Sequence, residues 1–221
     1  MSDKYQTTTL NAADGHTFNL SVLSTQQPSK GAVVVLQEVF GITNNIYAVG
    51  EEFAAAGFTV VIPHLFDRIQ TQLVVPYTDV KQGVDYVTSL DPQQTLMDIS
   101  AAVEYAKQFG AVATVGYCWG GSLAFRSAVE FPVKASIAYY GGQIANMCEQ
   151  QPEAPVQYHF GKLDKFIPAE DVAKIRAAQP DGEIYEYDAD HGFSCNERAS
   201  FDAEAHQLAF SRSVAFLSEH L

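Results

Sequence analysis

Hydrophobic and polar residues are arranged along the chain in blocks typical of strands and helices in alternation. Short apolar or β-rich runs predict strands at residues 32–36, 58–63, 113–115, 134–140, 156–160 and 183–187. Helical periodicity predicts helices at residues 45–56, 93–109, 169–178 and 203–217, another from residue 122, and a weaker one after residue 79. Such alternation favours an α/β fold with a mainly parallel, doubly wound sheet.

The N-terminal part has a different pattern. Two β-rich runs, residues 5–10 and 17–23, flank the turn signal Ala13-Asp14-Gly15-His16 and predict an antiparallel hairpin. Residues 67–91 are the least regular stretch, and we expect them to form an excursion over the site. No repeat or low-complexity linker interrupts the 221 residues. We therefore expect one domain, residues 1–221.

The composition limits the function. Hydrophobic residues make up 47%, and 13 basic against 26 acidic residues leave a net charge of −13, which disfavours nucleic acid and anionic membranes as partners. The three cysteines form no CxxC pair, so we expect no disulfide framework or zinc site. We expect no cofactor and no other metal. Without an apolar leader or spanning run, we expect a soluble cytoplasmic protein. The sequence leaves the oligomeric state open, with a monomer favoured.

The candidate chemistry centres on Gly116-Tyr117-Cys118-Trp119-Gly120-Gly121. This is the G-x-C-x-G form of a nucleophile elbow, a strained strand-to-helix turn with cysteine in place of the usual serine. Glycines on either side let the helix fold back closely, and its N-terminal dipole favours a thiolate. The alternative is a buried cysteine in a glycine-rich turn.

Polar residues that follow the apolar runs supply partners for this nucleophile, because sites in parallel sheets lie at the carboxyl ends of strands. In α/β-hydrolases the order along the chain is nucleophile, acid, histidine. Asp164 and His191 each follow a predicted strand and fit that order after Cys118. Asp190 is a rival for Asp164, although neighbours on a turn seldom face each other.

Glu38 follows the buried strand at residues 32–36 and lies between apolar residues. A carboxylate there is costly to bury without a partner, so either it belongs to the site or it faces water on a loop. The same loop supplies the second oxyanion donor of such hydrolases, which would be the backbone N–H of Val39 beside that of Trp119.

At these residues the chain resembles the dienelactone hydrolases, the cysteine-dependent α/β-hydrolases also called carboxymethylenebutenolidases. The matching stretches span nearly the whole chain in order and are Asp14-Gly15-His16-Thr17-Phe18, Gln37-Glu38-Val39-Phe40-Gly41, Gly116-Tyr117-Cys118-Trp119-Gly120-Gly121, Tyr139-Tyr140-Gly141, Phe166-Ile167-Pro168 and His191-Gly192-Phe193. The resemblance implies an α/β-hydrolase fold, a triad of Cys118, His191 and Asp164, a resting thiol that interacts with Glu38, and a thioester acyl-enzyme.

The chain departs from the family where the dienelactone carboxylate is held. Cys195 stands at the position of one family arginine, and only Lys81 lies near the position of the other. Arg68 and Arg198 are further candidates for binding substrate, and His64 replaces a family aspartate near Arg68. The resemblance therefore implies ester or lactone hydrolysis but leaves dienelactone itself open.

Four aromatic residues could line an apolar pocket or belong to the core, namely Tyr77, Trp119, Tyr139 and Phe193. A competing hypothesis keeps the fold without turnover, as a ligand-binding or thiol redox-sensing protein, because an activated cysteine is also an oxidation target. The sequence places no resolving cysteine for that role.

Overall fold

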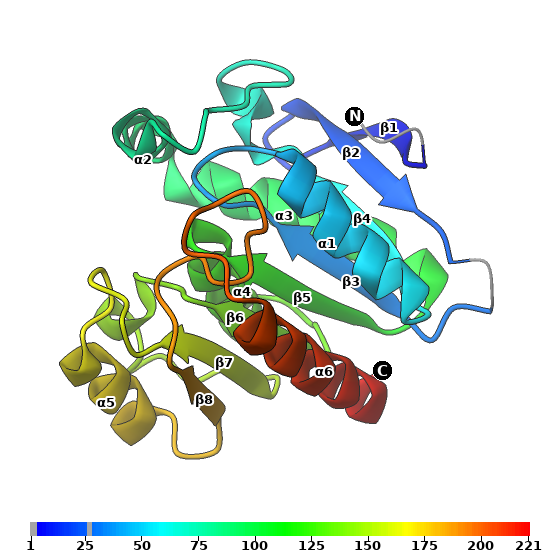
Figure 1. The fold of residues 1–221 in the computed structure, drawn as a ribbon. Coiled ribbons are helices and arrows are strands. Elements are labelled where there is room, and N and C mark those ends of the chain that lie inside the picture. Colours follow the sequence, from blue (N-terminus) through cyan, green and yellow to red (C-terminus); the bar gives the residue numbers. More distant parts are fainter. Residues whose placement is uncertain (1–3, 26–27) are drawn as a thin grey trace. The chain divides into compact units, whose positions relative to one another are not determined.

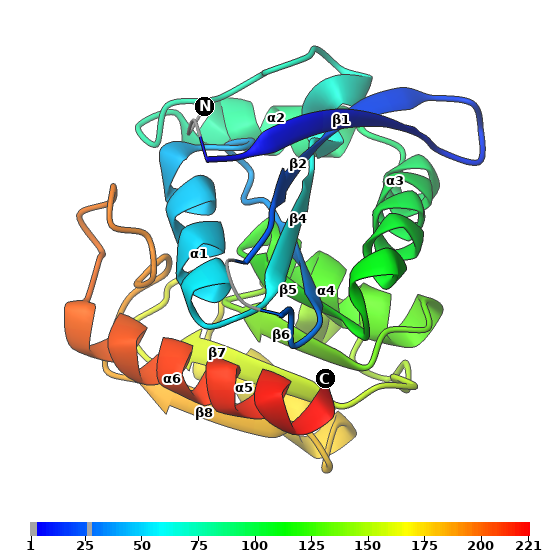
Figure 2. The ribbon, with the colours of Figure 1, turned by 90° about the vertical axis from the view of Figure 1, so that its right-hand side faces the viewer.

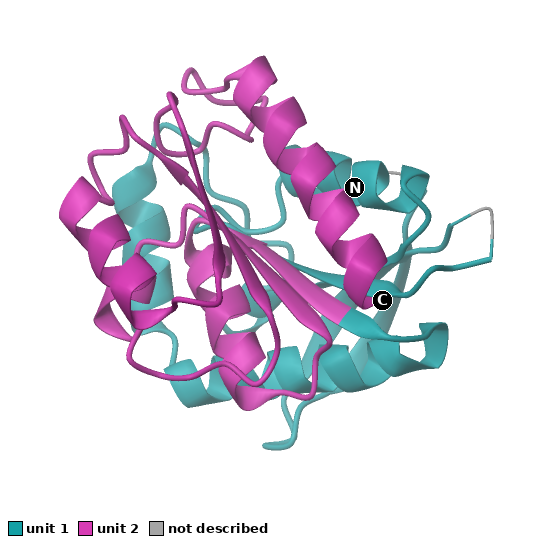
Figure 3. Ribbon diagram, turned by 90° about the horizontal axis from the view of Figure 1, so that it is seen from below, with its two compact units in different colours: residues 1–112 teal, residues 113–221 magenta. Residues whose placement is uncertain are grey.

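A computed structural model describes residues 4–25 and 28–221 of the chain. The chain divides into two compact units, residues 1–112 and 113–221, which Figure 3 colours teal and magenta. No helix within the described ranges is both long and apolar enough to cross a membrane.

The first unit carries a sheet with the strand order β1-β2-β4-β3. Its elements are β1 (Gln6–Asn11), β2 (Thr17–Leu23), β3 (Ala32–Leu36), α1 (Asn44–Ala55), β4 (Thr59–Pro63), the 3₁₀ turn η1 (Leu65–Arg68), α2 (Val80–Ser89), α3 (Pro92–Ala106) and the 3₁₀ turn η2 (Lys107–Phe109). The β1–β2 pair is antiparallel with Thr9 opposite Asn19, and β3 is parallel to β4. The predicted hairpin is thus confirmed, and Gly15 adopts the positive φ of +86° at its turn.

Helices cover this sheet on both sides, as Figure 2 shows for α1 and α3 about strands β2 and β4. Asp91 caps α3 by accepting hydrogen bonds from the N–H groups of Gln93 and Gln94, and Pro92 occupies the first turn, where its missing N–H costs nothing. Because β3 and β4 are buried along their whole lengths, their apolar runs lack alternation.

The second unit carries the parallel strands β5-β6-β7-β8. Its elements are β5 (Val112–Tyr117), α4 (Trp119–Glu130), β6 (Ala135–Tyr139), the 3₁₀ turn η3 (Ile144–Asn146), β7 (Val156–Gly161), α5 (Ala169–Ala178), β8 (Glu183–Tyr187) and α6 (Ala203–His220). Helix α4 packs against β6, and α6, red in Figure 1, packs against β6 and β7.

Three helix boundaries differ by three residues from those expected. Helix α3 ends at Ala106 rather than at residue 109, because the chain continues there as the 3₁₀ turn η2. Helix α4 begins at Trp119 rather than at residue 122. Gly120 and Gly121 suggested a turn, but both are buried in the first helical turn, where packing outweighs their poor helix propensity. Helix α6 continues to His220, three residues beyond the expected end. The last residues are polar, so the hydrophobic periodicity that predicted the helix does not extend to them.

Candidate active site

Cys118 lies between the end of β5 and the start of α4, with φ of +56° and ψ of −116°. This left-handed conformation is costly for a residue with a Cβ and commonly marks a functional site. The Cys118 N–H donates a hydrogen bond to the Tyr139 carbonyl at 3.0 Å, which ties the turn to the end of β6. The side chain remains partly exposed.

Glycine is required around this turn. A Cβ on Gly116 would lie 1.8 Å from the Gly120 carbonyl oxygen, and one on Gly121 would lie 2.4 Å from the Tyr139 carbonyl oxygen. Both obstacles are backbone atoms, so neither can move aside as a side-chain tip can. The two glycines therefore let α4 start directly behind the cysteine, whose carbonyl oxygen accepts from the Gly121 and Ser122 N–H groups at 3.0 and 3.3 Å.

His191 and Asp164 come together from the loops that follow β8 and β7. Asp164 Oδ2 lies 2.7 Å from His191 Nδ1, and both side chains are buried. The His191 ring also forms a hydrogen-bonding interaction with the Cys118 side chain. Since Nδ1 is occupied by Asp164, Nε2 is the ring nitrogen left for the sulfur. Asp164 and His191 thus form a hydrogen-bonded pair within the second unit, and Cys118 is the other side chain that acts on the ring.

The charge state of His191 follows from these contacts. Burial by itself lowers the pKa of the imidazole, but the hydrogen bonds and charges of Asp164 and Cys118 outweigh it and raise the pKa to about 10. At neutral pH the ring is therefore an imidazolium. A positive charge beside a sulfur atom stabilises negative charge on that atom.

The second oxygen of Asp164 fixes the carboxylate. Asp164 Oδ1 accepts a hydrogen bond from the Phe166 N–H at 2.8 Å. Asp190, the rival aspartate, instead accepts from the His191 backbone N–H at 2.7 Å. Asp190 therefore contacts the histidine backbone, while Asp164 contacts the ring.

Aromatic rings surround His191. The ring centroids of Tyr140 and Phe166 lie 5.0 and 5.3 Å from that of the imidazole. Phe166 is 67% exposed, which is unusual for a large apolar side chain and puts it at the rim of the site. Tyr139 and Phe193 are buried, so of the two possibilities, pocket lining or core, these two residues belong to the core.

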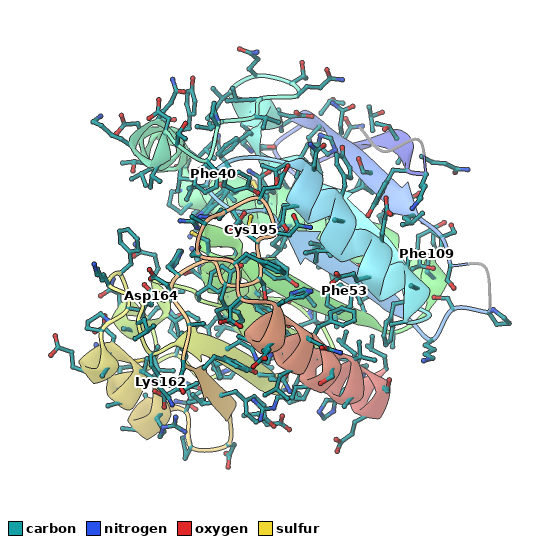
Figure 4. All side chains as sticks on the ribbon, in the orientation of Figure 1. Phe40, Phe53, Phe109, Lys162, Asp164 and Cys195 are labelled. Carbon is teal, nitrogen blue, oxygen red and sulfur yellow. The ribbon has the colours of Figure 1, made fainter. Side chains whose placement is uncertain are left out.

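The loop before α6 carries two further residues considered in the sequence. Figure 4 labels Cys195 on this loop, and its side chain is fully buried. The Arg198 guanidinium lies against Gly192, where an added Cβ would approach its Nη1 to 2.5 Å. Arg198 thus extends back to the residue that follows His191.

Glu38 lies in the first unit, in the turn that follows β3. Its side chain is fully buried, which excludes the water-facing alternative. Tyr77 donates a hydrogen bond from its hydroxyl to Glu38 Oε2 at 3.2 Å, and the same hydroxyl lies 2.7 Å from Thr43 Oγ1. Val39, the expected oxyanion donor, comes next in this turn. It contacts α2, where a Cβ on Gly83 would lie 2.5 Å from the Val39 carbonyl oxygen.

Arg68 and Lys81, two candidates for binding substrate, have other partners in the structure. Arg68 donates from Nε and Nη2 to the two oxygens of Asp98, each at 2.7 Å, and from Nη1 to Asp14 at 2.8 Å. Its side chain is only 8% exposed. Lys81 is exposed on α2 and pairs with Asp85 one turn later.

The part of the chain that the structure describes contains no group of three or more His, Cys, Asp or Glu side chains arranged to hold a metal ion.

Comparison with known proteins places the chain in a family. The profile described as the dienelactone hydrolase family matches residues 19–221. The chain belongs to the dienelactone hydrolase family. It is 31% identical over 199 residues to carboxymethylenebutenolidase 1 of Cupriavidus pinatubonensis, an alignment that covers 84% of this chain and 85% of that protein. It is 29% identical over 218 residues to the carboxymethylenebutenolidase of Pseudomonas putida, covering 93% and 92%.

Solved structures agree on the fold. A candidate dienelactone hydrolase of Klebsiella pneumoniae superimposes with a TM-score of 0.84 at 22% identity, covering 97% of this chain and 99% of that one. The expected α/β-hydrolase fold is thereby confirmed. Membership of the dienelactone hydrolase family makes the protein an ester or lactone hydrolase.

The sequence analysis did not identify the residues that bind the side chains of Glu38 and Arg68. Tyr77 binds Glu38 from 39 positions away, and Asp98 binds Arg68 from 30 positions away. An aspartate on the buried face of α3 is the one signal that could have been used, because a buried carboxylate requires a partner.

Proposed function

We propose that the protein hydrolyses a neutral ester or lactone by attack of the Cys118 sulfur on the carbonyl carbon. The observation that carries this proposal is the hydrogen-bonded pair of Asp164 and His191 with Cys118 acting on the ring, the cysteine lying at a left-handed turn in front of α4. A nucleophile, a base within reach of it and a group that orients the base are the parts required for covalent acyl transfer.

The proposed reaction starts once Glu38 has accepted the proton of the resting Cys118 thiol, which leaves a thiolate beside the imidazolium. The sulfur forms a bond to the carbonyl carbon, and the carbonyl π electrons move to its oxygen. When this tetrahedral intermediate collapses, the carbon–oxygen bond breaks and the leaving alkoxide takes the proton from His191 Nε2. The products of this half are an alcohol, a thioester on Cys118 and a neutral imidazole; in a lactone, the alcohol remains attached to the acyl group.

Water completes the cycle. Neutral His191 takes a proton from water as the oxygen attacks the thioester, and collapse of the second intermediate breaks the carbon–sulfur bond. Carboxylic acid leaves, and the thiolate and imidazolium are restored. In this proposal Asp164 keeps the ring oriented, as its 2.7 Å contact with Nδ1 supports.

Two backbone N–H groups would stabilise the oxyanion. Trp119 is the first residue of α4 and directly follows Cys118, so its backbone N–H belongs to the N-terminus of the helix. Val39 lies in the turn after β3, and in α/β-hydrolases the second oxyanion donor comes from the loop at this position. We assign Glu38 the role of accepting the thiol proton when substrate enters and returning it after turnover. Its complete burial supports this role.

The test uses p-nitrophenyl acetate. We expect a burst of p-nitrophenol equal to the enzyme concentration when deacylation is slower than acylation, and complete loss of turnover after treatment with iodoacetamide. Cys118→Ala should lower kcat/KM by more than about a hundredfold, as loss of a covalent nucleophile generally does. Cys148→Ala, a buried cysteine of the same unit, is the matched control. Near-parental turnover in a folded Cys118→Ala variant would refute the assignment. A parent protein whose Cys118 is alkylated by iodoacetamide but which hydrolyses no ester would favour the redox-sensing alternative.

A further inference from the structure

A cavity of about 220 Å³ lies in the first unit, beyond the ends of β3 and β4. His64, Asp67 and Gln72 contribute polar groups to its lining, and Phe66 and Leu73 contribute apolar ones. At the roughly 30 Å³ that a water molecule occupies in the liquid, the cavity has room for about seven waters or one small organic molecule.

This cavity is distinct from the surroundings of Glu38. Gln37 lines it, whereas Glu38, Val39 and Tyr77 do not. Gln37 and Glu38 are consecutive in the turn after β3, but their side chains have different partners: Gln37 Oε1 accepts from the Leu65 N–H at 3.2 Å, and Glu38 Oε2 accepts from the Tyr77 hydroxyl at 3.2 Å. The hydrolytic proposal therefore leaves the cavity without a role.

His64 offers the cavity an unused ring nitrogen. The side chain is only 4% exposed, and its Nε2 lies 2.8 Å from Ser21 Oγ. Within residues 4–25 and 28–221, Nδ1 has no hydrogen-bond partner. Burial lowers the pKa of His64, although the charge of Asp67 opposes the shift, so the imidazole is neutral at pH 7. A neutral imidazole whose Nδ1 has no protein partner can accept a hydrogen bond from a ligand that enters the cavity.

Asp67 supplies negative charge. Its Oδ2 accepts from the backbone N–H and the side-chain amide of Asn19, at 2.8 and 2.7 Å, while Oδ1 has no donor among the described residues. No lysine or arginine is among the described residues that line the cavity. The neighbouring Arg68 is paired with Asp14 and Asp98. A carboxylate or phosphate would thus meet Asp67 without a compensating cation, whereas a protonated amine would meet a free carboxylate oxygen.

The cavity wall is held in a defined shape. Gly41 has φ of +83°, and a Cβ there would lie 2.3 Å from the Leu73 carbonyl oxygen. Gly41 also bridges to Val74, and the Val75 N–H donates to the Phe40 carbonyl at 2.9 Å. Gln72, at the exposed side of the cavity, adopts φ of +58°, a conformation that costs free energy for a residue other than glycine. Shaped walls with few polar groups are typical of ligand sites.

We propose that this cavity binds a small ligand with a protonated amine and an apolar body, such as a primary arylamine or alkylamine. The ammonium group donates hydrogen bonds to Asp67 Oδ1 and, in the tautomer that leaves Nδ1 unprotonated, to His64. The apolar body contacts Phe66 and Leu73. This site is independent of the hydrolytic proposal and needs no catalytic turnover.

The experiment compares three molecules of one shape by isothermal titration calorimetry at pH 7: benzylamine as the cation, benzyl alcohol as the neutral analogue and benzoate as the anion. We expect saturable binding of one benzylamine per chain, at least tenfold weaker binding of benzyl alcohol and no binding of benzoate. Asp67→Asn, which keeps the side-chain size, should weaken benzylamine binding at least tenfold, as expected for loss of a charge-assisted hydrogen bond.

Asp85→Asn is the matched control, because it removes one carboxylate from an exposed position on α2 in the same unit. Its benzylamine affinity should equal that of the parent. The proposal is overturned if benzylamine does not saturate, if benzoate binds equally well, or if a folded Asp67→Asn variant binds as the Asp85→Asn control does.

Discussion

Asp164 and His191 are joined by a 2.7 Å hydrogen bond across two loops that follow different strands of the second unit. Each aspartate oxygen has one donor, the imidazole Nδ1 on Oδ2 and the Phe166 N–H on Oδ1. Both oxygens of the carboxylate are therefore held in place, so the carboxylate can hold the imidazole ring in one orientation. Preorganisation of this kind is what an orienting residue contributes to catalysis.

The contrast between the two aspartates gives the first prediction. Asp164→Asn should lower kcat by about 10²- to 10⁴-fold, because the amide N–H can donate to Nδ1 and so favour the imidazole tautomer with its proton on Nε2. Asp190→Asn should lower it by less than about tenfold, since Asp190 contacts only the His191 backbone. Both variants are assayed with p-nitrophenyl acetate after their melting temperatures are compared with the parent. A larger loss in Asp190→Asn would reassign the orienting residue.

Two buried histidines should give opposite pH dependences of stability. His159 is fully buried, with Nδ1 2.7 Å from the Tyr187 hydroxyl and Nε2 2.8 Å from Gln157 Oε1. Burial, helped by the charge of Arg212, lowers its pKa to about 3. The unfolded chain takes up this proton below pH of about 6.5, whereas the folded protein does not until about 3, so stability falls as the pH falls through that window.

His191 has the reverse sign. Because its folded pKa is raised to about 10, its stabilising contribution is complete below pH of about 6.5 and is lost as the pH rises towards 10. Urea unfolding at pH 4.5, 7 and 9.5 measures both effects. The stability difference between parent and His159→Gln should shrink at pH 4.5, and that between parent and His191→Gln should shrink at pH 9.5. Differences that stay constant with pH would contradict the stated charge states.

The elements of the site could be predicted from the sequence more fully than its contacts. The glycines about Cys118 encode the elbow locally, since Gly116 meets the backbone of Gly120 only four residues later. The order of strands and of the polar residues after them also indicated Asp164 as a partner of His191, and the two lie 2.7 Å apart. By contrast, the contacts of Arg68 with Asp14 and Asp98 join residues 54 and 30 positions apart, and no periodicity encodes them.

The ion pairs of Arg68 bear on the choice of substrate. An arginine held by two carboxylates and 8% exposed has little positive charge to offer a further anion. We therefore expect a neutral lactone to be hydrolysed with a kcat/KM at least equal to that of its carboxylate-bearing analogue. Paired assays at low and high ionic strength check this expectation. A strong, salt-sensitive preference for the carboxylate would identify a cation that binds it, and Arg198→Gln and Lys81→Gln would then show which one.

The last prediction concerns Glu38, whose buried carboxylate distinguishes the proposed mechanism from an ordinary triad. If it accepts the thiol proton when substrate enters, Glu38→Gln removes that base while keeping size and hydrogen-bonding capacity. We expect kcat/KM to fall by about 10²- to 10⁴-fold, the usual range for a lost general base. Tyr77→Phe is the matched variant, because it removes the 3.2 Å hydrogen bond to Oε2 and leaves the carboxylate charge.

Tyr77→Phe should therefore cost much less activity than Glu38→Gln. The readout that separates catalysis from structure is the rate of Cys118 alkylation by iodoacetamide between pH 5 and 9, measured beside kcat/KM. A negative charge that keeps the resting sulfur protonated should slow alkylation, so Glu38→Gln should alkylate faster at neutral pH although it turns over more slowly. If turnover and alkylation both keep their parental pH profiles in Glu38→Gln, the carboxylate has a structural role, and Cys118 is activated by His191 alone.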